Sequence, residues 1–77
     1  MQHTKIKSLS RGRPFKLADN ETIAFRGRSV QIQCLHGLIW VTWPDGNEQV
    51  VMEGRSVPVC SRGMICVQAF AASVVKV

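Results

Sequence analysis

The chain has 77 residues, of which 45% are hydrophobic and 19% charged, and its formal net charge is +5. This length fits one small domain, and the composition is typical of a globular protein rather than a disordered one. No apolar run approaches the roughly 20 residues that span a bilayer, so a multidomain enzyme, a membrane-spanning helix and a disordered tail are excluded.

The positive charge is concentrated at the start of the chain. Five basic residues precede the first acidic one: Lys5, Lys7, Arg11, Arg13 and Lys16. We expect residues 1–13 to form a flexible basic arm and residues 14–77 to form one β domain, in which the charges from Leu17 to Val77 sum to zero. Such an arm can contact a polyanion by counterion release, with Arg11 and Arg13 as candidate contacts, or simply keep a small protein soluble.

Glycines from Gly27 to Gly63 recur at short, regular intervals and separate segments rich in Val, Ile and Trp. Turn signals at this spacing predict an all-β fold, a single antiparallel barrel or sandwich. The expected strands lie around Phe15 and Leu17, then at 22–26, 29–35, 38–43, 48–52, 57–60, 64–67 and 73–77. No segment has the 3.6-residue apolar period of a helix.

The segment 38–43 is apolar on both faces, as expected for a central strand that is covered on both sides. Its odd positions, which end at Trp43, are expected to face the core. Trp40 and Thr42 then lie on the opposite face, where an aromatic side chain often contacts a ligand or a partner. A neighbouring segment that covers Trp40 is the alternative, and a homodimer interface on this face is a further one.

Two hairpins are predicted from turn residues. A two-residue loop of Asp45 and Gly46 would place Trp43 opposite Glu48, with Val50 and Met52 on the core face. A second turn at 61–63 would pair Val57 and Val59 with Val67 and Ile65. Both registers bring apolar residues together.

The three cysteines are Cys34, Cys60 and Cys66. An odd number without a secretory signal favours free thiols in a reduced, cytoplasmic setting. A zinc site would need Cys34 and His36 to meet the other two cysteines, and no paired short spacing supports it. We therefore expect no metal, no cofactor and no catalytic group.

The stretch from His36 to Thr42 reads Gly-x-hydrophobic-Trp-hydrophobic-Thr after its histidine, and further glycine turns follow at Gly54 and Gly63. It resembles an uncharacterised bacterial family of small cupin-like domains. The resemblance implies a double-stranded β-helix, or jelly-roll-like, fold and no activity. Metal-dependent cupins use several histidines and a glutamate, whereas His36 is the only histidine in this β domain.

These observations favour a non-enzymatic binding module for a small molecule or a protein partner, with Trp40, Thr42 and His36 as candidate contacts. The first alternative is a small nucleic-acid-binding barrel that uses the basic arm. It is less favoured, because the positive charge does not lie among the aromatic residues that would stack on bases. A metal-dependent cupin enzyme is a third and weaker alternative.

Overall fold

The computed structural model describes residues 4–6 and 11–77, and every regular element within them is a β-strand. The strands, in chain order, are β1 (Thr4–Ile6), β2 (Phe15–Leu17), β3 (Thr22–Arg26), β4 (Ser29–His36), β5 (Leu38–Trp43), β6 (Asn47–Met52), β7 (Ser56–Cys60), β8 (Met64–Ala69) and β9 (Ser73–Lys76). The predicted all-β fold is therefore confirmed.

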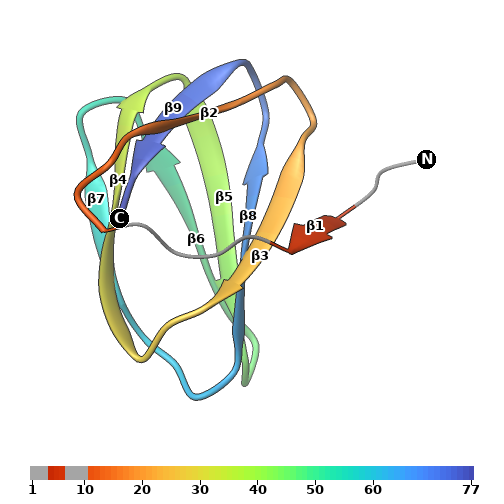
Figure 1. Ribbon diagram of the computed structural model, residues 1–77, viewed down its shortest axis with the longest axis vertical. Coiled ribbons are helices and arrows are strands. Elements are labelled where there is room, and N and C mark those ends of the chain that lie inside the picture. The colour runs from red at the N-terminus through yellow and green to blue at the C-terminus, as the bar shows by residue number, and fades with distance from the viewer. Residues whose placement is uncertain (1–3, 7–10) are drawn as a thin grey trace.

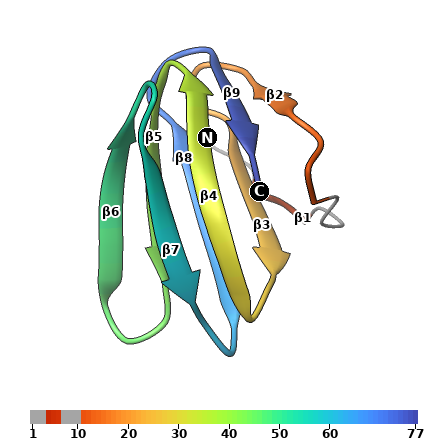
Figure 2. The same cartoon turned by 90° about the vertical axis from the view of Figure 1, so that its left-hand side faces the viewer.

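The strands form two sheets that lie face to face (Figures 1 and 2). One sheet has the order β1-β3-β8-β5-β6 and the other the order β2-β9-β4-β7. The sheets do not join into the closed barrel that was one form of the prediction, because the edge strands β6 and β7 pair only within their own sheets. The architecture is a β-sandwich.

The core lies between the sheets and comes from alternate residues of each strand, as the period of two requires. Phe25, Ile32, Ile39, Val41 and Ile65 are at most 1% exposed. Trp43 packs against this cluster from one end, as predicted from its odd position.

The first hairpin differs from the predicted register by one residue. Its loop has three residues, and Trp43 pairs with Asn47 rather than facing Glu48. Pro44 has no N–H to give to a strand ladder, so it belongs to the loop. Asp45 and Gly46 both take positive φ, 73° and 75°. The prediction that Val50 and Met52 face the core is wrong: they are 47% and 58% exposed.

The second predicted hairpin is not a hairpin. β7 pairs with β4 in one sheet, whereas β8 lies between β3 and β5 in the other, so the turn at 61–63 crosses between sheets. The predicted faces are nevertheless right, because Val57, Val59, Ile65 and Val67 are all buried. Side-chain alternation indicates which face is buried but not which strand lies alongside.

The start of the chain adds a short strand to the edge of the larger sheet. β1 pairs in parallel with β3, and the Lys5 ammonium lies 2.9 Å from the Glu21 carboxylate. Of the predicted basic arm, residues 1–3 and 7–10, including Lys7, lie outside the described residues.

The corrected register of the first hairpin predicts opposite outcomes for two neighbouring valines. Val51→Ala removes a side chain that is 2% exposed and should lower the free energy of unfolding by about 1–3 kcal/mol. Val50→Ala changes a half-exposed side chain, so its effect should stay within about 0.5 kcal/mol. Urea denaturation measures both. A larger loss of stability for Val50→Ala than for Val51→Ala would contradict this register and favour the two-residue loop.

Candidate functional site

The outer face of the five-stranded sheet carries the largest group of exposed apolar side chains. Residues that pair across a sheet share a face, and the partners Leu38–Met52 and Trp40–Val50 alternate with the buried Ile39 and Val51. We call this surface the outer face; its members are Leu38, Trp40, Thr42, Glu48, Val50, Met52 and Phe70. No second layer covers it within the described residues, so the expectation that 38–43 is covered on both sides is wrong.

Trp40 is the centre of the outer face. Its ring stacks on Phe70, which follows β8, with centroids 6.1 Å apart and planes 15° from parallel. Its indole Nε1 donates a hydrogen bond to Glu48 Oε1, 3.2 Å away on β6. These two contacts restrain the ring, as required of a rigid contact residue that loses little entropy on binding.

Exposure increases from Trp40 toward the β6 edge. Trp40 and Thr42 on β5 are half-buried, whereas Val50 and Met52 on β6 are 47% and 58% exposed. Phe70, on the β8 side of Trp40, is 43% exposed. Isolated apolar residues on a surface are ordinary, but a contiguous group on one sheet face marks an interaction surface. Thr42 shares this face with Trp40, as predicted, because it pairs with Glu48 and Cys66.

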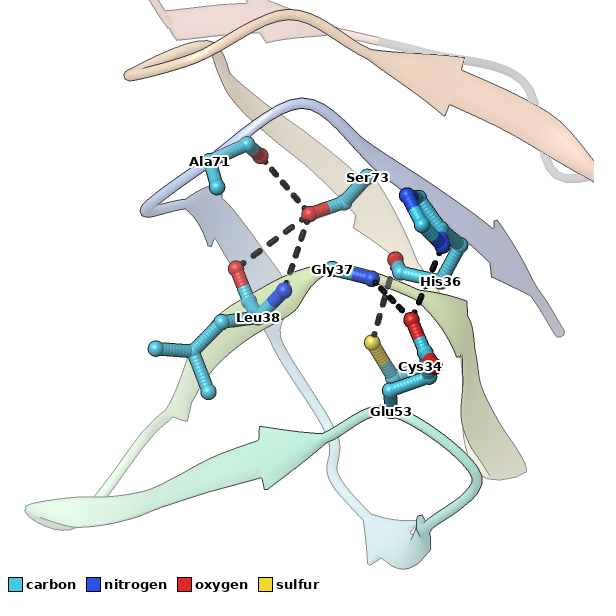
Figure 3. Close-up of polar contacts among 7 residues, drawn as sticks. All are labelled: Cys34, His36, Gly37, Leu38, Glu53, Ala71 and Ser73. Atoms are coloured by element: carbon cyan, nitrogen blue, oxygen red, sulfur yellow. Dashed lines mark hydrogen bonds and ion pairs between the residues drawn. The ribbon is translucent and has the colours of Figure 1, made fainter.

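His36 does not belong to the outer face. It ends β4 in the other sheet, at the corner where Gly37 leads the chain across to β5 (Figure 3). Its Nδ1 lies 2.8 Å from Glu53 Oε1, and the same oxygen accepts a hydrogen bond from the Gly37 amide. Both side chains are more than half exposed, so this ion pair contributes little to stability.

Ser73 organises the same corner from the inside. Its buried hydroxyl donates to the Ala71 carbonyl at 2.7 Å and accepts a hydrogen bond from the Leu38 amide at 3.1 Å (Figure 3). Gly37 has φ of +91°, and a Cβ there would collide with Ser73. The polar groups of the corner therefore hold the chain in its crossing between sheets.

The three cysteines have different surroundings and none is paired. Cys34 is buried, and its thiol donates a hydrogen bond to the His36 carbonyl. Burial raises the pKa of the Cys34 thiol above its ordinary value, and the nearby Glu53 carboxylate raises it further. Cys60 is exposed at the end of β7, and Cys66 is half-buried on β8.

The two predicted polyanion contacts lie near the C-terminal residue and are not adjacent to the outer face. The guanidinium of Arg11 donates to the Ser29 carbonyl at 3.2 Å, and the next residue, Gly12, donates its amide to the Val77 carbonyl. Arg13 is exposed. Contact of Arg11 and Arg13 with a polyanion stays a prediction.

Side-chain alternation predicts Trp40 and Thr42 on the face that they occupy, but it places Glu48, Val50 and Met52 on the wrong face and does not place Phe70. The three residues of β6 are misplaced because a one-residue error in register exchanges the two faces of a strand. The loop position of Pro44 was the signal in the sequence that could have corrected it.

Comparisons with family models, curated proteins and solved structures find no match to this chain. In residues 4–6 and 11–77, no helix is long and apolar enough to cross a membrane. The same residues contain no group of three or more His, Cys, Asp or Glu side chains that could hold a metal ion.

The cysteine environments predict an order of reactivity. With iodoacetamide at pH 8, Cys60 should be alkylated first, and Cys34 only at the rate at which the protein opens, because a buried protonated thiol is neither accessible nor nucleophilic. Mass spectrometry of peptides over time measures this. Urea should remove the difference, and equal rates in the folded protein would contradict the placement of Cys34.

Proposed function

We propose that this chain is a non-enzymatic binding module whose partner is a second copy of itself, joined through the free edge of β6. The observation that carries the proposal is the combination of a strand edge without lysine, proline or a bulge with the exposed Val50 and Met52 of the outer face.

The four sheet edges of the described fold differ in how they are protected. A strand edge presents unpaired N–H and C=O groups, and proteins block such edges with lysine, proline or short strands. β1 and β2 have three residues each and carry Lys5 and Lys16, and β7 carries Pro58. β6 has six residues, contains neither lysine nor proline, and pairs with β5 without a bulge. β6 is therefore the edge best suited to accept another strand.

A side chain already occupies part of the β6 edge. Gln49 donates its side-chain amide to the Val50 carbonyl, at 3.1 Å, which satisfies an acceptor that an adjacent strand could otherwise use. A neighbouring strand would displace this local bond and replace it with a ladder of backbone bonds.

Antiparallel pairing of β6 with its own copy has two-fold symmetry, which is the commonest symmetry of protein dimers. Centred on Val50, it places Val50 beside Val50 of the second copy. Met52 then lies beside Glu48 of the second copy, so no two carboxylates face each other. The two outer faces become one continuous apolar surface, which extends the Trp40 platform across both copies.

The strand pairing supports the proposal that the fold is cupin-like. β2 pairs with β9, β3 with β8, β4 with β7 and β5 with β6, so the pairings are nested about one central turn. Nested pairs distributed over two sheets are the scheme of a jelly roll, the fold that the resemblance implies.

Val50→Lys tests the β6 edge. It would place two like charges side by side at the two-fold axis and should raise the dimer dissociation constant about tenfold or more, because opposed like charges destabilise a strand pair. The side chain is 47% exposed, so the fold should tolerate the change. Sedimentation equilibrium over a range of concentrations measures the constant.

Thr22→Lys is the matched control. Thr22 lies on the same face of the same sheet, on β3, with β8 and β5 between it and β6. The Thr22→Lys substitution should leave a dimer paired through the β6 edges unchanged, and it should weaken a dimer in which two outer faces contact each other. A monomeric wild-type chain at millimolar concentration, or a dimer sensitive to Thr22→Lys alone, would overturn the proposal.

A further inference from the structure

Three turns meet at the end of the sandwich opposite the His36 corner. They connect β3 to β4, β5 to β6 and β7 to β8, and both views show them gathered at the lower end (Figures 1 and 2). None of them contributes to the outer face or to the β6 edge described above. Their side chains form a separate polar surface.

Contacts between the turns hold this end in one arrangement. The Ser61 amide donates to the Arg28 carbonyl at 2.9 Å, which ties the third turn to the first. Gly63 lies so close to Pro44 that a Cβ there would approach the proline ring to 2.9 Å, which packs the third turn on the second. Asn47 donates to the Pro44 carbonyl at 2.8 Å. Groups on these turns are therefore pre-positioned, which lowers the entropic cost of binding.

An open depression of about 660 Å³ lies between the turns. Its lining includes Arg28, Asp45, Asn47, Ser61 and Arg62. A second depression of about 620 Å³ adjoins it and is lined by Arg26 together with Arg28 and Arg62. Arg28 and Arg62 line both, so a group bound in either depression lies beside both residues. We call these adjoining depressions the arginine basin.

The arginine basin carries a net positive charge, because three arginines and one acidic residue line it. Within the described residues, neither Arg26, Arg28 nor Arg62 forms an ion pair. Asp45 is the acidic residue in the lining of the larger depression. Unpaired guanidiniums from different turns suit a phosphate group, because each can donate two parallel hydrogen bonds to its oxygens.

We propose that the arginine basin binds a small phosphomonoester. The phosphate lies between Arg28 and Arg62, the Asn47 amide donates a further bond, and Asp45 accepts a hydrogen bond from a hydroxyl group of the same ligand. Single-stranded nucleic acid fits less well, because binding it needs aromatic platforms, and the Trp40–Phe70 pair lies on the outer face instead.

The test titrates inorganic phosphate and glycerol phosphate into the protein at constant ionic strength and follows backbone NMR shifts. Both should perturb the three turns saturably and raise the melting temperature. Arg28→Gln combined with Arg62→Gln should weaken phosphate binding about tenfold or more, since both charge-assisted pairs to the phosphate are lost. Bound phosphate should also slow the alkylation of Cys60, which lines the same depression.

Two control variants make the result specific. Arg55→Gln removes an exposed arginine between β6 and β7, outside the basin, and should leave phosphate binding unchanged. Asn tolerates the positive φ of Asp45, so Asp45→Asn removes the carboxylate without straining the turn. It should strengthen the binding of inorganic phosphate but not that of glycerol phosphate. Equal responses to phosphate and chloride, or binding that survives the double arginine variant, would overturn the proposal.

Discussion

The reversal of the chain at Pro44–Gly46 is the constraint on which the rest of the structure depends. Asp45 and Gly46 adopt consecutive left-handed conformations, and the four nested strand pairs lie symmetrically about this turn in the sequence. Phe25 pairs with Ile65, and Phe15 pairs with Val75. In each pair the two residues are equally far from Asp45 along the sequence. The strand pairs thus keep nearly the same register about this turn, and crossings such as that at Gly37 distribute them between two sheets.

That register decides which surface is available for binding. With three residues in the loop, Val51 enters the core, and Val50 and Met52 face outward beside Trp40. A two-residue loop would exchange these faces, because the side-chain period of a strand is two. The apolar outer face is therefore a consequence of this turn, and the proposed self-association combines it with the edge position of β6.

The two ends of the sandwich have different chemistry. At the Gly37 corner, the Ser73 hydroxyl and the Glu53 carboxylate are bonded to the backbone, so they maintain the crossing between sheets. At the opposite end, the backbone of one turn bonds to that of another, and among the described residues neither Arg28 nor Arg62 forms an ion pair. This contrast separates a structural corner from a candidate ligand site.

The sequence by itself determined the class of fold, most strand positions and the buried side of nearly every strand, since alternation and turn residues are local properties. It placed Trp43 inside and Trp40 outside for that reason. Only the tertiary structure decided that β7 and β8 belong to different sheets, that His36 lies away from Trp40, and that three distant turns form the arginine basin. Strand neighbours depend on long-range packing between the sheets, which the alternation of a single strand does not encode.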